Sequence, residues 1–340
     1  MHTVESRRRA LMALAGITML PWVCAAQSGP STLSPFTVAG WSKPISEITN
    51  LLVEPDKGFF RNEGLDLVYM PGAGGGDAIR NLLSGQADVA FTDPGSFFMA
   101  IDKGEKLKAI YDIYPQNVFN VVSLASSQIH RPEDLKGKRI GVYSLSSGTR
   151  QNLLVLLHRA GLTENDVEIV VTGVLNFAPL MQGRVDALAA TDTGLLVGRQ
   201  RGLGEVNVMQ VRDSLNLSSD MFVVRESDYV EKAPLLRSFL KGYRNSAQWM
   251  IDHPDEAATL AMKRAIDGTN RDMNAAVIAV RNEAARSSPT ADGQRRALGD
   301  FDMAAWQQGA DAYFELGLIK QPIDVSRVVD KGLLPESGRE

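Results

Sequence analysis

Apolar and polar positions along most of the chain alternate between short β-rich runs and longer runs with helical periodicity. Short apolar runs bounded by glycine or polar residues predict strands, and apolar residues repeated every three or four positions predict helices. The predicted strands are 36–41, 65–70, 87–91, 107–114, 119–124, 139–143, 168–172, 185–190 and 221–225. The predicted helices are 45–57, 78–84, 96–103, 150–160, 177–182 and, in a largely helical remainder, 234–253. Strands that alternate with helices predict an α/β protein with mostly parallel strands.

Two segments of the chain, 82–91 and 180–189, share one order of features. Each runs from the end of a helix through a glycine, a polar residue, a small or β-branched residue and an aspartate into a buried strand. The repeat predicts two lobes of similar topology. Because no long linker separates them, we expect the chain to cross between the lobes twice and to form a hinge. We assign residues 36–122 and 222–340 to lobe I and residues 123–221 to lobe II.

The first 26 residues differ from the rest of the chain. Arg7–Arg9 precede the apolar stretch 10–20, and small residues follow at 25–26. This order predicts a signal peptide that is cleaved after residue 26, and the stretch is too short to span a bilayer. The arginines leave both the general and the twin-arginine export routes open. Cys24 follows Val23, where a lipid-anchored protein has a small residue, so we expect a soluble exported product.

The charge balance and the cysteine content exclude several classes of function. The chain has 36 Lys and Arg against 40 Asp and Glu, a net charge of −4, with no basic block after the leader. A nucleic-acid-binding surface needs clustered positive charge, so no nucleic-acid partner is predicted. The only cysteine, Cys24, lies in the predicted leader, so the mature chain has no disulfide and no thiolate chemistry. We predict no metal site, no cofactor and a monomeric protein.

Several stretches together resemble a known family. Residues 57–66 have the sequence KGFFRNEGLD, residues 134–142 have the sequence DLKGKRIGV, and segments 83–100 and 235–254 match in order. Over roughly residues 36–320 the chain resembles the periplasmic substrate-binding proteins of ABC importers, in the nitrate, sulfonate and thiamine-pyrimidine-precursor group. The resemblance implies a type II periplasmic-binding-protein fold, in which two α/β lobes close on a ligand, and an inner-membrane permease as partner.

The loops that follow the predicted strands hold the candidate ligand-binding residues. In open parallel sheets, ligands bind beyond the carboxyl ends of the strands, where loops lead into helices. There, glycines bring backbone N–H groups close to an anion, hydroxyls donate hydrogen bonds, and aromatic rings stack on flat ligands. Asn176 is a further candidate. The ligand-binding residues that we predict are Trp41, Gly74, Gly75, Thr92, Asp93, Ser144, Ser146, Ser147, Gly148, Thr149, Phe177, Thr191 and Asp192.

Each candidate also has an ordinary structural interpretation that the sequence leaves open. Trp41 equally fits a buried core position, Asp93 fits a helix cap, and residues 144–149 fit an N-cap followed by a solvated Arg150. The glycine-rich segment 71–77 has neither the spacing of a dinucleotide fingerprint nor the Gly-Lys-Ser/Thr of a Walker loop. The sequence therefore favours a small-ligand site over a nucleotide site.

The leading functional hypothesis is a non-enzymatic receptor that captures a sulfonate, a carboxylate or a pyrimidine-like compound. An enzyme is the main alternative, because this fold group also resembles a thiamine-pyrimidine synthase that uses a histidine and a cysteine-rich motif. The mature chain retains only His130, His158 and His253 and has no catalytic motif around them. A periplasmic sensor for a membrane receptor is the third hypothesis, and the sequence does not separate it from uptake.

Overall fold

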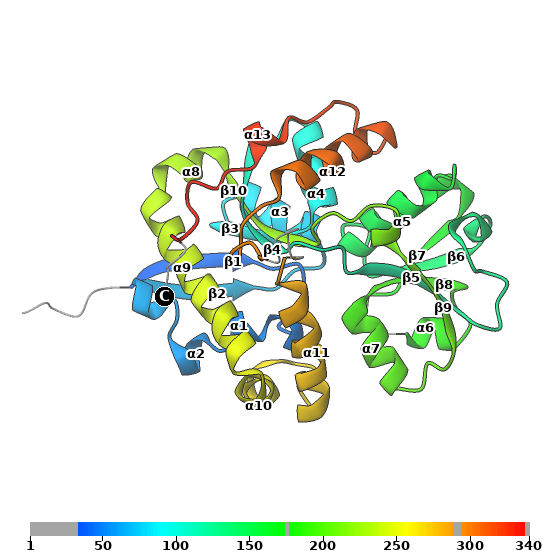
Figure 1. Cartoon of the computed structure of the whole chain (residues 1–340), viewed down its shortest axis with the longest axis horizontal. Helices are drawn as coiled ribbons and strands as arrows, with labels where there is room; N and C mark the ends of the chain where they lie inside the picture. The colour runs from blue at the N-terminus through cyan, green and yellow to red at the C-terminus, as the bar shows by residue number, and fades with distance from the viewer. Residues whose placement is uncertain (1–32, 174–176, 288–293, 337–340) are drawn as a thin grey trace, which may run out of the picture. The chain divides into compact units, whose positions relative to one another are not determined.

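Two five-stranded mixed sheets organise the part of the chain that the computed structural model describes, residues 33–173, 177–287 and 294–336 (Figure 1). The predicted leader and Asn176 lie outside the described residues. We call the first sheet with its helices lobe I and the second sheet with its helices lobe II.

The sheet of lobe I combines parallel strands with one antiparallel strand. Its strands in spatial order are β2 (Leu65–Met70), β1 (Ser34–Ala39), β3 (Val89–Thr92), β10 (Asp220–Arg225) and β4 (Leu107–Tyr114). β1 pairs in parallel with β2 and β3, whereas β10 runs antiparallel to β3 and β4. The antiparallel strand β10 therefore lies inside the sheet although it comes last in the chain.

The sheet of lobe II repeats this arrangement. Its strands in spatial order are β7 (Glu168–Val171), β6 (Arg139–Val142), β8 (Ala187–Thr191), β5 (Phe119–Leu124) and β9 (Val206–Gln210). β6 pairs in parallel with β7 and β8, whereas β5 runs antiparallel to β8 and β9. The repeated segments 82–91 and 180–189 lead into β3 and β8, which occupy the same place in the two sheets. The predicted similarity of the lobes is confirmed.

Helices cover both sheets, and five of the described helices lie within a few residues of predicted ones. The helices are α1 (Thr49–Leu52), α2 (Glu54–Lys57), α3 (Gly75–Leu83), α4 (Pro94–Asp102), α5 (Gly148–Arg159), α6 (Ala178–Met181), α7 (Asp192–Gln200), α8 (Glu226–Glu231), α9 (Ala233–Asp252), α10 (Pro254–Arg264), α11 (Arg271–Ala284), α12 (Met303–Glu315) and α13 (Val325–Val328). The single helix predicted over 45–57 is wrong. That segment forms the 3₁₀ turn Ser46–Ile48, α1 and α2, and α2 ends at Gly58, whose φ is +70°.

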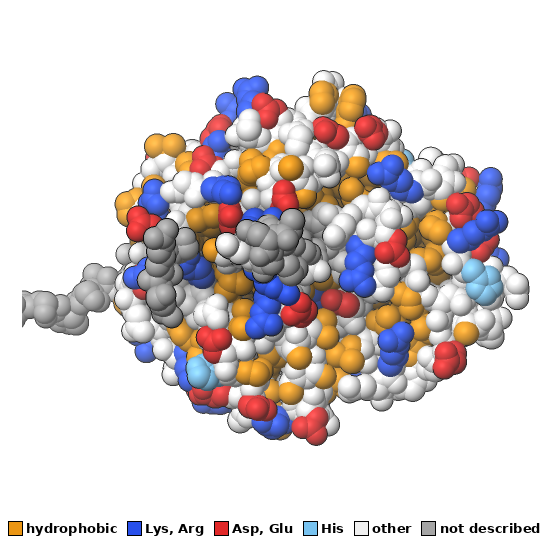
Figure 2. Space-filling view, in the orientation of Figure 1, with side chains coloured by type: hydrophobic (Ala, Val, Ile, Leu, Met, Phe, Trp, Pro, Cys, Tyr) orange, Lys and Arg blue, Asp and Glu red, His pale blue; other side chains and the backbone are white. Residues whose placement is uncertain are grey.

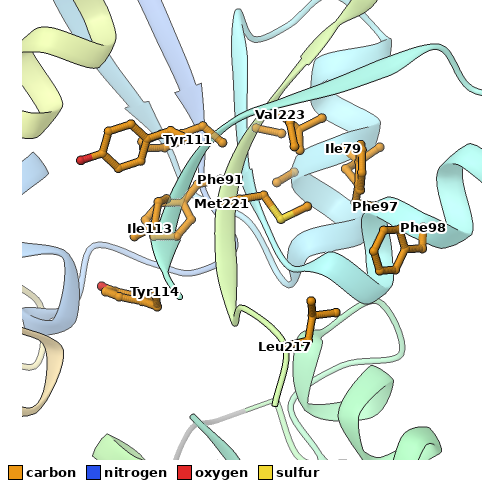
Figure 3. Packing of buried hydrophobic residues seen from close by; sticks show 14 of the residues in the cluster. Ile79, Phe91, Phe97, Phe98, Tyr111, Ile113, Tyr114, Leu217, Met221 and Val223 are labelled. Carbon is orange, nitrogen blue, oxygen red and sulfur yellow. The ribbon is translucent and has the colours of Figure 1, made fainter. Parts of the chain in front are cut away.

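One hydrophobic core extends over the sheet of lobe I and one face of the sheet of lobe II. Figure 3 shows Tyr111 and Ile113 of β4 on one side of β10, and Ile79 of α3 and Phe97 of α4 on the other side. A second cluster, which contains Phe177 and Leu188, lies under α6 and α7 on the opposite face of the lobe II sheet. Each sheet is thus buried on both faces, which explains why its strands are near-continuous apolar runs.

The two segments that cross between the sheets are hydrogen-bonded to each other. Ser219 donates from its Oγ to the carbonyl oxygen of Gln116 at 2.5 Å and accepts at the same Oγ from the Val118 N–H at 2.8 Å. The Asn117 N–H donates to Asn216 Oδ1 at 3.0 Å. Each of the strands β5 and β10 belongs to a single sheet over its whole length. Both crossings between the lobes therefore lie a few residues before the lobe boundaries that we predicted.

Charged side chains of both signs are interspersed over the molecular face shown in Figure 2, with no single basic patch on that face. Within the residues that the structure describes, no helix has both the length and the apolar character that crossing a membrane would require.

Asp112 of β4 is a buried carboxyl in lobe I. It accepts hydrogen bonds from Ser218 Oγ at 2.5 Å and from Trp306 Nε1 at 3.1 Å. Burial raises the pKa of Asp112 to about 7, although both hydrogen bonds act in the opposite direction. The folded protein therefore holds a proton that the unfolded chain releases, and the stability that this proton contributes is lost as the pH rises to about 7.

We predict that Asp112→Asn removes this pH dependence. The unmodified protein should lose about 2 kcal/mol of its free energy of unfolding between pH 5 and pH 8 through this group, and the variant should not. The difference in free energy of unfolding between the two proteins should therefore shift by about 2 kcal/mol in favour of the variant. Urea unfolding at both pH values measures the difference. The control variant Asp213→Asn changes an exposed aspartate and should show no such trend. Parallel pH profiles for Asp112→Asn and the unmodified protein would contradict the prediction.

Candidate functional site

A pocket of about 430 Å³, including its mouth, is lined by residues of both lobes. It lies where the carboxyl ends of parallel strands in the two sheets give way to helices. Gly75 begins α3, Gly148 begins α5, and Thr191 caps α7. The strand-end rule used on the sequence therefore leads to a real pocket.

Eight of the predicted site residues line this pocket. They are Trp41, Gly74, Gly75, Asp93, Ser147, Gly148, Thr149 and Thr191. Of these, Trp41 is only partly buried, and its Nε1 is enclosed without a hydrogen-bond partner. An indole N–H in this position is available to a ligand that carries an acceptor.

Three of these residues also cap helices, so the structural and the functional interpretations hold together. Asp93 accepts from the Ser96 N–H at 2.8 Å, and Thr191 Oγ1 accepts from the Gly194 N–H at 3.2 Å. Ser147 Oγ lies 2.7 Å from Thr149 Oγ1 and caps α5. The caps fix the loops at the pocket wall. The first N–H groups of α5 point out of the helix end and have no acceptor within the helix.

Three further predicted residues lie beside the pocket and not on its wall. Thr92 is fully buried behind Gly75, and its Oγ1 has no hydrogen-bond partner. Ser144 and Ser146 of lobe II donate from their hydroxyls to the carbonyl oxygen of Ala73 in lobe I, at 2.5 and 3.2 Å. These two serines therefore hold the lobes together.

The last two predicted residues have other partners. Phe177 is 2% exposed and belongs to the lobe II core, where its ring packs against the backbone of α7 at Gly198. A ring in that position does not stack on a ligand in the pocket, in contrast to the expectation. Asp192 pairs with Arg281 of lobe I.

The pocket wall also includes residues that the sequence did not indicate. They are Glu47, Val118, Phe119, Tyr143, Asp220 and Arg281. Tyr143 follows β6 directly, so the strand-end rule was sufficient to find it. Asp220 is the first residue of β10, which runs antiparallel to β3. It therefore lies at the edge of the lobe I sheet where the parallel strands end. Arg281 lies in α11, which carries no local signal of a site.

A buried cluster of charges joins the two lobes at one side of the pocket. We call it the Arg281 cluster, and it consists of Arg281, Glu47, Asp192 and Thr193. Arg281 of α11 is 1% exposed. Its Nε lies 3.0 Å from Glu47 Oε2, and its Nη2 donates to Asp192 Oδ1 and, at 2.8 Å, to Thr193 Oγ1. Thr193 in turn donates to Glu47 Oε1 at 2.7 Å. One guanidinium of lobe I is thereby bound to two residues of α7 in lobe II.

A second contact between the lobes lies in the glycine-rich loop. The Gly76 N–H donates to the carbonyl oxygen of Ser146 at 3.0 Å, next to the two serine hydroxyls that bind Ala73. Together with the Arg281 cluster, this contact keeps the lobes closed over the pocket.

Three carboxyl groups line the pocket. Burial raises the pKa of Asp93 to about 6, and it raises the pKa of Asp220 well above the usual range. Burial also raises the pKa of Glu47, against the opposing effect of Arg281.

Within the described residues, no group of three or more His, Cys, Asp or Glu side chains is arranged to hold a metal ion. His158 does not line the pocket and instead contacts the carbonyl oxygen of Leu316 through Nδ1 at 2.6 Å.

Known proteins share the sequence pattern and the architecture of this chain. A family model described as NMT1/THI5 like matches residues 45–257. The riboflavin-binding protein RibY of Chloroflexus aurantiacus is 23% identical over 321 residues, which cover 93% of this chain and 90% of that protein. A putative thiamine biosynthesis protein of Haemophilus influenzae is 25% identical over 215 residues, which cover 61% of this chain and 66% of that protein.

A solved structure extends the comparison to the fold. The alkanesulfonate-binding protein SsuA from Xanthomonas axonopodis pv. citri, bound to MOPS, superposes with a TM-score of 0.66 at 15% identity, covering 88% of this chain and 99% of that chain. The likeness confirms the periplasmic-binding-protein fold that the sequence predicted.

Gly74 allows a direct test of closure between the lobes. Its φ is +127°, and a Cβ at this position would lie 2.4 Å from the carbonyl oxygen of Ser146 in lobe II. We predict that Gly74→Ala disfavours the closed form and weakens ligand binding about tenfold or more, because overpacking of this kind typically costs more than 1 kcal/mol. Distances between spin labels on cysteines introduced at the exposed Gln182 and Glu231 measure the closed fraction.

The matched control is Gly104→Ala. Gly104 also has a positive φ, +91°, but a Cβ there meets nothing within 4 Å. The Gly104→Ala variant therefore has the backbone strain without a contact to lobe II, and it should leave the closed fraction unchanged. Equal effects of the two substitutions would show that backbone strain, and not the contact between the lobes, is responsible.

Proposed function

Because the chain belongs to the NMT1/THI5-like family, we propose that it is the solute-binding component of an ABC uptake system. The mature protein acts in the periplasm as a monomer, and its partner is a permease in the inner membrane. The cargo is a small organic molecule that binds in the pocket between the lobes. The candidate cargo classes are an organic anion, either sulfonate or carboxylate, and a pyrimidine-like ring.

The observation that carries the proposal is that both lobes build the pocket wall. Trp41 and Asp93 come from lobe I, whereas Ser147 and Thr149 come from lobe II. A ligand that contacts both lobes stabilises the closed form by the difference between its affinities for the closed and the open forms. The hinge contacts at Ser219 provide the axis for this change. A permease that binds surfaces of both lobes then distinguishes the loaded from the empty protein.

The eight predicted residues that line the pocket keep the role of ligand-binding residues within the proposal. Trp41, Gly74, Gly75 and the segment 147–149 contact the cargo directly. Thr92, Ser144, Ser146 and Asp192 act behind them by fixing the loops or by joining the lobes.

An enzyme remains the second candidate, because one relative is named as a putative thiamine biosynthesis protein. The part of the pocket wall that the structure describes includes no histidine and no cysteine. Native mass spectrometry of the mature protein, purified from periplasm, separates the two functions. A bound small molecule that is recovered unchanged supports a receptor, whereas a molecule converted during incubation supports an enzyme.

Trp41 provides an optical test of the proposed function. Of the tryptophans after the leader, Trp41 lines the pocket, Trp306 is buried in the lobe I core, and Trp249 contacts Phe59 and Lys57. We predict that the molecule recovered with the protein changes the tryptophan emission of the stripped protein, and that Trp41→Phe abolishes most of this change. Trp249→Phe is the control and should preserve it. A response that survives in Trp41→Phe and is lost in Trp249→Phe would place the ligand elsewhere.

A further inference from the structure

Asp220 is a buried carboxyl that faces the pocket. It is the first residue of β10, it is 7% exposed, and it lines the pocket together with Asp93 and Glu47. Nothing in the sequence pattern marks it, because it lies at the end of the second crossing and not after a parallel strand.

The three carboxyl groups differ in how the protein satisfies them. Asp93 accepts from the N–H and the hydroxyl of Ser96, at 2.8 and 2.7 Å. Glu47 accepts from Thr193 and pairs with Arg281. Within the described part of the chain, no N–H or O–H donates to the carboxyl of Asp220, and its electrostatic environment consists of burial and of charges at a distance. Of the three carboxyl groups, Asp220 is therefore the one that receives no donor from the described part of the protein.

A carboxyl that is buried without a donor is unfavourable. Burying an ionised group without a partner costs several kcal/mol, so the group either holds a proton or receives a hydrogen bond from a bound molecule. Burial and the nearby Asp93 both raise the pKa of Asp220, which agrees with a group that has no donor in the unliganded protein. A ligand with an N–H group directed at Asp220 would supply the donor that is missing.

The basic side chain on the described wall is already neutralised. Arg281 binds Glu47 and Asp192 and donates to Thr193. An anionic group in the pocket would compete with two carboxylates for that guanidinium and would lie near Asp93 and Asp220 as well. The N-termini of α4 and α7 offer it little compensation, because Asp93 and Thr191 already cap them. The backbone N–H groups at the start of α3 and α5 also lie on the wall, and they serve a neutral acceptor as well as an anion. Unpaired like charges of this kind exclude wrong ligands.

From these contacts we propose that Asp220 accepts a hydrogen bond from an N–H group of the cargo, so that the pocket selects a neutral or cationic nitrogen compound and rejects sulfonates and carboxylates. The proposal rests on the proposed receptor function and decides between the two cargo classes left open there. The free Nε1–H of Trp41 on the same wall suits an acceptor on the cargo. A planar ring with both N–H donors and an acceptor fits both requirements.

Four benzene derivatives of similar size test the charge preference. Benzamidine is a cation with N–H donors, benzamide is neutral with N–H donors, and benzoate and benzenesulfonate are anions without them. Calorimetric titration of the stripped mature protein should show that benzamide or benzamidine binds about tenfold tighter than either anion, the difference expected for one hydrogen bond to a charged group. Equal or tighter binding of benzoate or benzenesulfonate overturns the proposal.

The native mass spectrum distinguishes failure of this proposal from failure of the receptor function. If none of the four probes binds, the molecule recovered with the protein decides. A recovered nitrogen compound that is neutral or cationic supports the proposal, and a recovered sulfonate or carboxylate overturns it while the receptor function stands. If no probe binds and no molecule is recovered, both proposals fail.

The role of Asp220 itself is tested by Asp220→Asn, with Asp213→Asn as the control. Asp213 is exposed in the 3₁₀ turn Val211–Asp213 and does not line the pocket. We expect Asp220→Asn to weaken binding of the N–H probe about tenfold and to narrow its preference over benzoate, because the new amide can donate to an anion. The control should match the unmodified protein. Unchanged affinity and selectivity in Asp220→Asn would overturn the proposal.

A measurement on the unmodified protein makes the test independent of the variant's folding. Carboxyl carbon NMR follows the titration of Asp220 directly. An N–H ligand that donates to the carboxylate should lower the pKa of Asp220, since it stabilises the charged form. A carboxyl with a purely structural role would not respond to the probe, and an unchanged titration in the saturated complex would overturn the proposal.

Discussion

The closed arrangement of this protein depends on the need to pair one buried guanidinium. Arg281 lies in lobe I, and the carboxylates that neutralise it come from lobe I in the case of Glu47 and from lobe II in the case of Asp192. A buried charge that loses one of its partners is strongly destabilising. Separation of the lobes removes Asp192 and Thr193 from Arg281 and leaves water to replace them. Glu47 and Arg281 also form part of the pocket wall, so groups that join the lobes line the cavity as well.

The loops around the pocket serve two purposes at once. Asp93, Ser147 and Thr191 cap helices and also line the cavity, because a helix that follows a parallel strand begins at the edge where the pocket lies. The caps fix the positions of the loops without a ligand. Ser144 and Ser146 contribute differently, by binding the backbone of the glycine-rich loop in the other lobe. The cavity is therefore built largely before a ligand arrives, and closure completes it.

The charged groups of the pocket point to a different ligand class from the one that the sequence favours. Hydroxyls, glycines and an arginine in the sequence favour an anion. In the structure Arg150 pairs with Glu164 away from the pocket, and Arg281 is held by carboxylates. Asp220 and Asp93 add carboxyl groups to the pocket wall. One relative is named for riboflavin binding, and one fold neighbour is bound to MOPS, a chemically different molecule. The side chains of each pocket set the choice.

The sequence by itself determined the α/β class, most of the strands, the two similar lobes and eight residues of the pocket wall. These features follow from local periodicity and from the rule that parallel strands end at a common edge, both of which are properties of neighbouring residues. Tertiary structure alone decided the role of Arg281, Asp220 and Phe177. Arg281 reaches the pocket from a distant helix, Asp220 from the start of an antiparallel strand, and Phe177 turns into the lobe II core. Which partners a buried side chain meets depends on how the elements pack, and local sequence does not record that.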